Sequence, residues 1–195
     1  MAITPDVLSD RAEGALRSIN LAMGQHQRAI SHLAVQRPTR LRPDIHDAKH
    51  SLQQSTIARV ASIAEAFCVD RLMAMAISEF KPDKSSARRA MFDDAMKGAT
   101  GTWSSIRGAF SEWHGVKPDW KPLEGVQEVR NAIAHGLGRL THRQASTRIS
   151  TVQRIRRIGL DVDSNDRLIL ADEDVLTVAS VCAQLIRDVD ERTRG

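Results

Sequence analysis

The segment Val129-Arg130-Asn131-Ala132-Ile133-Ala134-His135-Gly136 carries three strongly polar side chains within one short apolar stretch. Its small and apolar residues pack well, which predicts a helix with one buried face. We expect this helix to begin near Pro122 and to end at Gly136 and Gly138, because glycine readily adopts the backbone conformations that end helices. The polar groups would then be held by a rigid element.

Helix geometry separates these polar groups. Asn131 and His135 are four residues apart and share a face, whereas Arg130 and His135 are five apart and diverge by about 140° around the axis. Either the Arg130 side chain wraps back, or a second copy of the helix supplies the missing group across a two-fold interface. A histidine in the last turn of a helix meets the negative end of the helix dipole, which suits acid–base chemistry. In the simplest alternative, the three side chains form a capping and ion-pair cluster.

Apolar residues at helical spacing recur along most of the chain, which predicts an all-α bundle of long antiparallel helices. One short segment around 160–170 alternates and turns, which predicts a small β-hairpin before the C-terminal helix. We expect two regions: residues 1–42, a helix beginning at Thr4 and a basic connector packed on the bundle, and residues 43–195, the main helical domain. Further helices are expected at about 43–80, from Ser85 or Ser86, at 103–113 and from Asp172.

Composition limits the class of protein. The chain has 195 residues and a formal charge of +4, which permits an anionic partner. Cys68 and Cys182 lie in apolar helical patterns and are expected to be reduced core thiols. The chain begins without the features of a secretion signal and has no apolar run of membrane-spanning length, so we expect a cytoplasmic protein with no membrane contact.

An arginine-rich tract surrounds the polar motif. Residues 129–160 contain no Asp or Glu and seven arginines: Arg130, Arg139, Arg143, Arg148, Arg154, Arg156 and Arg157. Guanidinium groups match phosphate oxygens, so the last six are candidate RNA-binding residues. The alternative is a solvated basic helix without a ligand.

The motif resembles the signature of the HEPN ribonucleases, all-helical domains marked by an Arg, a short spacer and a His. The segment Ile57 to Leu72 is similar to the long helix of RiboL-PSP-type HEPN proteins, in which an acidic residue (here Glu65) precedes a small residue and an aromatic one. The similarity covers roughly residues 43–193 and includes the hairpin. HEPN toxins paired with a nucleotidyltransferase antitoxin usually carry Tyr two places after the His, whereas this chain has Leu137.

The resemblance implies a homodimeric, metal-independent endoribonuclease without a cofactor. The ribose 2′-hydroxyl would attack the adjacent phosphate and leave a 2′,3′-cyclic phosphate. His135 would transfer the proton, Arg130 would stabilise the phosphate charge, and Asn131 would orient the phosphate or the histidine. Glu65, or alternatively Asp70, would hold Arg130. Such proteins often act as toxins or phage-defence effectors under the control of an antitoxin or another regulatory protein.

Two other functions remain open at this point. A non-catalytic HEPN module would only dimerise or bind nucleotides, and a helical DNA-binding regulator would use the arginine-rich segment in a helix-turn-helix. His46 and His50 have ligand spacing, but no acidic or cysteine partner nearby completes a metal site. The aromatic face formed by Trp103, Phe110 and Trp113 is interpreted as core or dimer packing, with base stacking as the alternative.

Overall fold

The computed structural model describes residues 8–35, 45–80 and 85–194, and within these residues the chain forms eight helices and one hairpin. The helices are α1 (Asp10–Val35), α2 (Ile45–Phe80), α3 (Ser86–Thr100), α4 (Trp103–His114), α5 (Lys121–Gly136), α6 (His142–Ser146), α7 (Arg148–Arg157) and α8 (Asp172–Thr193). The hairpin pairs β1 (Asp161–Val162) with β2 (Leu168–Ile169) in antiparallel fashion. The predicted helical fold with a small hairpin before the last helix is therefore confirmed.

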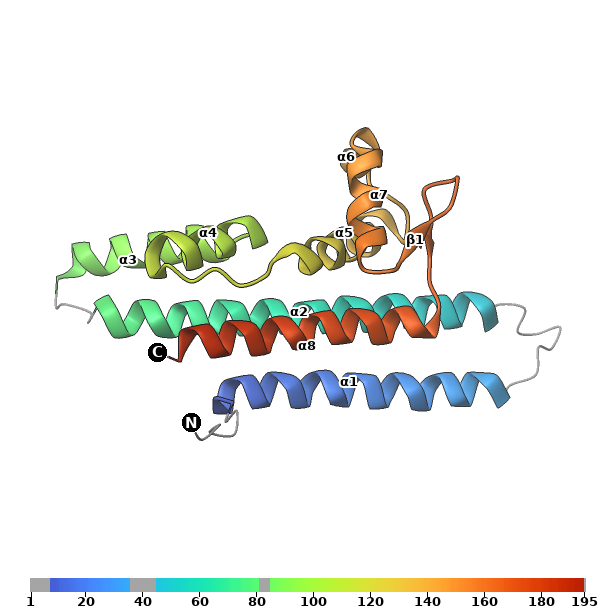
Figure 1. The fold of residues 1–195 in the computed structure, drawn as a ribbon, viewed down its shortest axis with the longest axis horizontal. Coiled ribbons are helices and arrows are strands. Elements are labelled where there is room, and N and C mark those ends of the chain that lie inside the picture. The colour runs from blue at the N-terminus through green and yellow to red at the C-terminus, as the bar shows by residue number, and fades with distance from the viewer. Residues whose placement is uncertain (1–7, 36–44, 81–84, 195) are drawn as a thin grey trace, which may run out of the picture.

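The helices form three layers (Figure 1). The long helices α2 and α8 make the middle layer, α1 covers one side of it, and α3, α4 and α5 cover the other. The core consists of apolar side chains that recur at helical spacing, such as Ile57, Val60 and Leu72 of α2 and Val178 and Ile186 of α8, all fully buried. The helices α6 and α7 and the hairpin project from the end of α5 (Figure 1).

Helix α1 begins later than the sequence indicates. The predicted cap Thr4 lies outside the described residues, and residues 8 and 9 are not helical, so a start at Thr4 was wrong. Ser9 supplies the cap instead: its Oγ accepts from the backbone N–H of Ala12 (3.2 Å). The Ser9 N–H (3.0 Å) and hydroxyl both donate to the buried carboxylate of Asp190 in α8. The helix start is therefore determined by a contact that is distant in sequence.

The connector 36–44 and the helix break expected at Lys81–Lys84 also lie outside the described residues, as does the side chain of His46.

A buried polar cluster joins α1, α2 and α8. The Nδ1 atom of His26 contacts Oγ1 of Thr56 (3.0 Å), and Asp172 accepts from Nε2 of Gln53 (2.8 Å) and pairs with Lys49 (2.9 Å). Burial lowers the pKa of the His26 imidazole below its usual value of 6.5, since it disfavours the charged ring. Burial acts to raise the pKa of the Asp172 carboxyl, but hydrogen bonds from Gln53 and Lys49 outweigh it and leave the pKa lowered.

Both cysteines are free and buried, in agreement with their apolar sequence patterns. Burial raises the pKa of the Cys68 thiol well above its usual value and that of Cys182 to about 12. Neither thiol will ionise near neutral pH, so both behave as core residues.

None of the helices in the described ranges combines the length and the apolar character needed to cross a membrane.

Candidate functional site

The motif helix α5 has the bounds that its sequence predicts. It runs from Lys121 to Gly136, with Pro122 in its first turn and Leu123, Val126, Val129 and Ala132 on its buried face. The left-handed residue at its end is Leu137 (φ 52°, ψ 41°), although glycine would adopt this conformation with less strain. The N–H of Gly138 then donates to the carbonyl of Ala132 (3.0 Å), which closes the helix.

The turn after the motif is fixed to two other elements. The Gly138 carbonyl accepts from the N–H of Leu168 (2.9 Å), and the Leu140 N–H donates to the Asp166 carbonyl (2.8 Å), so this turn adds to the hairpin. A Cβ atom at Gly138 would lie 2.3 Å from Nε2 of Gln54 in α2, and φ there is +84°. The left-handed φ favours glycine here, whereas the end of the Gln54 side chain could move aside for a Cβ atom.

Arg130 lies on the inner side of α5. It follows the buried residues Leu123 and Val126 by seven and four positions, which places the three on one helix face, and its side chain is half-buried.

Asn131 and His135 lie on the outer side of α5. They continue a stripe that begins with Glu124 and Glu128 at steps of four, three and four residues. His135 is exposed and Asn131 is half-buried. The structure thus brings Asn131 and His135 together and places Arg130 on another flank, as the spacing predicts.

The three motif side chains have no partner within the described part of the chain. Among residues 8–35, 45–80 and 85–194, the side chains of Arg130, Asn131 and His135 make no hydrogen bond and no ion pair. The capping and ion-pair cluster considered from the sequence is therefore not formed.

The carboxylate expected to hold Arg130 does not contact it. Glu65 is half-buried and forms no ion pair with Arg130 or with any other described residue. It follows Gln54 by eleven positions, so both lie on the face of α2 that is turned toward α5. The alternative, Asp70, pairs with Arg11 of α1 (3.2 Å) and so faces the opposite layer. Asp70 is thereby excluded from the site.

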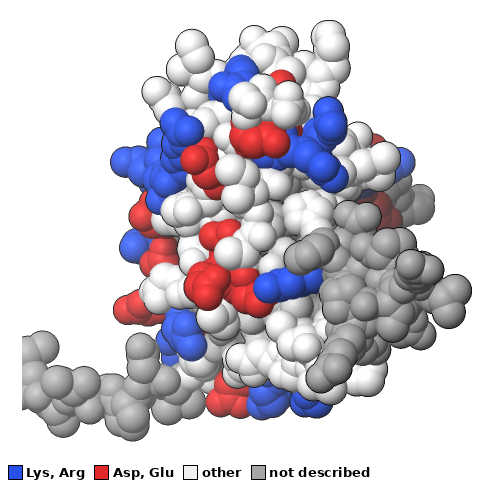
Figure 2. All heavy atoms as spheres, turned by 90° about the vertical axis from the view of Figure 1, so that its right-hand side faces the viewer, with Lys and Arg blue, Asp and Glu red and all other residues white. Residues whose placement is uncertain are grey.

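Four of the six arginines expected to bind RNA are paired with carboxylates. The pairs are Arg148–Asp166 (2.6 Å), Arg154–Glu128 (2.7 Å), Arg156–Asp161 (2.9 Å) and Arg157–Glu124 (3.1 Å). The acids come from α5 and the hairpin, outside the acid-free tract. Figure 2 shows acidic side chains among the basic ones on this end of the molecule. The tract that contains no acid in sequence is therefore lined by acids in the fold, and these four arginines are not free to bind RNA as the sequence indicates.

The other two of the six arginines are not paired with a carboxylate in the described chain. Arg139, just after the motif, and Arg143 in α6 are exposed and make no ion pair within the described part of the chain. They are the arginines of the tract with the fewest constraints on phosphate binding.

Sequence reasoning missed the two glutamates that organise the outer face of α5. Glu124 pairs with Arg107 of α4 and with Arg157 of α7 (both 3.1 Å). Glu128 pairs with Arg154 and accepts from Nε2 of Gln144 (2.7 Å). Their i,i+4 spacing on the stripe that leads to His135 was the available signal.

The contact between α5 and α7 is unusually close. A Cβ atom at Gly125 would lie 2.5 Å from the backbone oxygen of Arg154 and 2.9 Å from Cγ1 of Ile158. The two helices can approach this closely because position 125 has no side chain. The approach is what brings the α7 arginines to the glutamates of α5.

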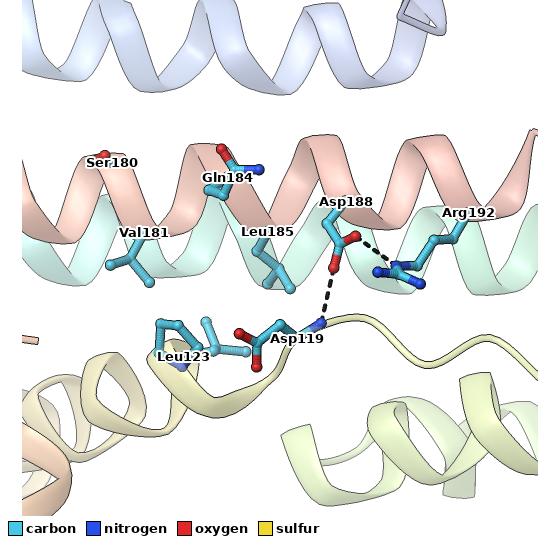
Figure 3. Close-up of a pocket in the computed structure, with 9 residues that line it drawn as sticks. Asp119, Leu123, Ser180, Val181, Gln184, Leu185, Asp188 and Arg192 are labelled. Atoms are coloured by element: carbon cyan, nitrogen blue, oxygen red, sulfur yellow. Dashed lines mark hydrogen bonds and ion pairs between the residues drawn. The ribbon is translucent and has the colours of Figure 1, made fainter. Parts of the chain in front are cut away.

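A pocket of about 500 Å³ lies between the start of α5 and α8 (Figure 3). Its floor includes Leu123, and Ser180 and Gln184 of α8 lie above it. The Asp188 carboxylate accepts from the Asp119 N–H (2.9 Å) and pairs with Arg192 across its rim. None of the motif side chains lines this pocket, so it is separate from the candidate site.

Within the described residues, no group of three or more His, Cys, Asp or Glu side chains has the arrangement needed to hold a metal ion.

Comparison of the chain with protein-family models, with curated proteins and with solved structures found no match. The case for a function therefore depends on the residues and their geometry.

Proposed function

We propose that this protein is a metal-independent endoribonuclease of the HEPN type that acts as a homodimer. The observation that carries the proposal is the absence of any partner for the Arg130, Asn131 and His135 side chains in the described chain, beside four arginines that are all paired. Because the Arg130 guanidinium makes no ion pair in the described chain, it is available to bind a phosphate. The resemblance of the motif to HEPN ribonucleases points to the same chemistry.

The reaction would be an in-line displacement at phosphorus. The 2′-oxygen forms a bond to the phosphate as the bond to the 5′-oxygen breaks, which yields a 2′,3′-cyclic phosphate and a 5′-hydroxyl. His135 takes the 2′-hydroxyl proton or protonates the leaving oxygen. Arg130 stabilises the charge on the phosphate, and Asn131 orients the phosphate or the imidazole. Glu65 would hold Arg130 once the site is assembled.

The divergence of Arg130 and His135 around α5 supports the proposal of a dimer. Because one helix presents them on different flanks, a second copy would bring an Arg130 to the His135 of the first. Two apolar side chains at this end favour such an interface: Leu137 is 89% exposed and Ile149 is 78% exposed.

RNA would first contact Arg139 and Arg143, which are exposed and make no ion pair in the described chain. The other arginines of the tract would have to exchange a carboxylate for a phosphate, which reduces their net contribution. We further propose that the protein acts in the cytoplasm as a toxin or phage-defence effector, restrained by an antitoxin or another regulatory protein.

The direct test is cleavage of RNA in the presence of EDTA. We expect intact RNA to be cut to products with 2′,3′-cyclic phosphate ends, and His135→Ala to reduce the rate by about 10² to 10⁴, because general acid–base catalysis contributes that much. Arg130→Ala should reduce it by about 10² to 10³. The matched control is Arg89→Ala, which removes an exposed arginine of α3. RNA left intact by the wild-type protein would favour the non-catalytic module.

Mixing the two inactive variants tests the dimer. If each site takes Arg130 from one copy and His135 from the other, an equimolar mixture of Arg130→Ala and His135→Ala regains about a quarter of the wild-type rate, because half of the dimers are mixed and each has one intact site. A site contained in a single copy would regain nothing.

The DNA-binding alternative has less support. A helix-turn-helix needs a turn of three or four residues before the recognition helix. Here Thr147 alone separates α6 from α7, and the arginines of α7 are paired. Sequence-specific binding of duplex DNA in a gel shift would nevertheless contradict the proposed function.

A further inference from the structure

A second pocket, of about 620 Å³, lies between α2, α3 and α4. Its lining is mainly apolar and includes Ala76, Met91, Phe92, Ala95, Met96 and Trp113. Ala76 is 22 residues beyond Gln54, the α2 residue next to Gly138, so the two sites are about 33 Å apart along α2. The pocket therefore belongs to a different part of the molecule from the motif.

One polar side chain in this pocket is not satisfied. The side chain of His114, in the last turn of α4, is 2% exposed and lines the pocket. Its Nδ1–H donates to Oε1 of Glu79 (2.9 Å), because a carboxylate only accepts. Its Nε2 is buried and has no hydrogen-bond partner among the described residues. In the neutral ring this atom is an acceptor, and a buried acceptor without a donor destabilises the protein.

The surroundings of His114 fix the ring and leave the pocket open. Trp113 meets the imidazole edge-on, with ring centroids 6.5 Å apart. Trp113 is 42% exposed and Met91 is 73% exposed, so both lie where solvent reaches the pocket. Methionine side chains adapt readily to the shape of a ligand.

We propose that this pocket binds an apolar small molecule with a single hydrogen-bond donor, a hydroxyl or an N–H group, which bonds to Nε2 of His114. The volume lies within the range of about 300 to 1,000 Å³ that is usual for small-molecule sites. An apolar lining with one oriented polar group is the common composition of such sites. The inference is independent of RNA cleavage, since no motif residue lines this pocket.

The hydrogen-bond requirement makes the proposal testable with two probes that share one ring system and differ by a methyl group on the oxygen. 2-Naphthol carries a hydroxyl donor, whereas 2-methoxynaphthalene has the same rings without it. We expect calorimetry or NMR titration of the full chain to show that 2-naphthol binds about tenfold more tightly, the effect of one net hydrogen bond. His114→Leu should remove this difference and leave the affinity for 2-methoxynaphthalene unchanged.

A second variant keeps the test valid if His114→Leu does not fold. Met91→Glu places a charge at the exposed rim and should abolish binding of both probes while RNA cleavage stays unchanged. The matched control, Leu176→Glu, introduces the same charge at a 52% exposed position of α8 and should bind both probes as the wild type does.

Three outcomes would overturn the proposal. These are failure of both probes to bind, equal affinities of the wild type for the two probes, and binding that persists in Met91→Glu. If neither probe binds and Met91→Glu dissociates a dimer, the pocket is an interface between copies.

Discussion

The arginines of α7 and the polar groups at the end of α5 are close in sequence and differ in what they contact. Arg154 and Arg157 are paired with Glu128 and Glu124, whereas Arg130 has no partner in the described chain. A run of like charges in a sequence can therefore contain two classes of residue. The paired arginines hold helices together, and the unpaired ones are available for a ligand.

The largest effect is expected from a substitution that pushes α7 away from α5. Gly125→Ala should lower the free energy of unfolding by about 2 to 3 kcal/mol, because the new Cβ meets the backbone oxygen of Arg154 at 2.5 Å and cannot be accommodated by a rotamer change. Chemical denaturation measures the effect. Gly98→Ala in α3 is the control: nothing lies within 4 Å of its Cβ, so it should stabilise the protein by about 0.5 to 1 kcal/mol. Equal effects of the two substitutions would show that the α5–α7 contact is looser than described.

Substituting one paired and one unpaired arginine compares what the two classes contribute to stability. Arg154→Ala should cost about 1 to 2 kcal/mol of stability, because it leaves the Glu128 carboxylate, 16% exposed, without its cation. Arg143→Ala should cost almost nothing, since it makes no ion pair in the described chain.

RNA binding should show the reverse order. Arg143→Ala should weaken binding and reduce the slope of log K against log salt by about one, whereas Arg154→Ala should leave the slope unchanged. Fluorescence anisotropy with labelled RNA at several salt concentrations provides the measurement. A reduced slope for Arg154→Ala alone would assign the phosphate contacts to α7.

The histidines show a similar contrast between the buried His26 and the exposed His135. Because burial lowers the pKa of His26, the unfolded chain takes up a proton at a higher pH than the folded protein does. The contribution of His26 to the free energy of unfolding is therefore fully present above pH 6.5. It is lost as the pH drops below this value, by at most about 1.4 kcal/mol per pH unit. The Asp172 carboxylate, which faces the ring, opposes this loss, and Lys49 adds to it.

His26→Asn tests this assignment, since the amide can donate to Thr56 without taking up a proton. Its free energy of unfolding, measured by denaturation at several pH values, should be flatter between pH 6.5 and 5 than that of the wild type. An unchanged slope would assign the acid sensitivity to another group.

The smallest effect is expected at Leu137. Leu137→Gly should raise stability by up to about 1 kcal/mol, because φ there is +52° and the side chain, 89% exposed, loses little packing. Thermal unfolding of a dilute sample measures it. If Leu137 lies in the dimer interface, the same variant should weaken dimerisation, which sedimentation detects.

Local patterns predicted most of the fold. Helical spacing located α2, α4, α5 and α8, and the turn residues 164–166 located the hairpin. The short helix α6 was missed, although Thr141 and Gln144 form a capping box that the sequence displays.

The site was harder to predict because its electrostatics are not local. The spacing of Asn131 and His135 gave their shared face, since helix geometry alone determines it. The partners of Arg148 and Arg156 lie in the hairpin, and the sequence does not show that the hairpin folds back onto these arginines. The distance between Glu65 and Arg130 likewise depends on how α2 and α5 pack.

The contact of Ser9 with Asp190 has a consequence for synthesis on the ribosome. The two residues are 181 positions apart, so α1 leaves the ribosome long before α8 exists to hold its first turn. Until α8 emerges, α2 can cover part of the apolar face of α1, but the first turn of α1 lacks the Asp190 carboxylate that holds it. A ribosome that stalls before Asp190 would therefore carry a nascent chain whose first helix is still vulnerable to proteases.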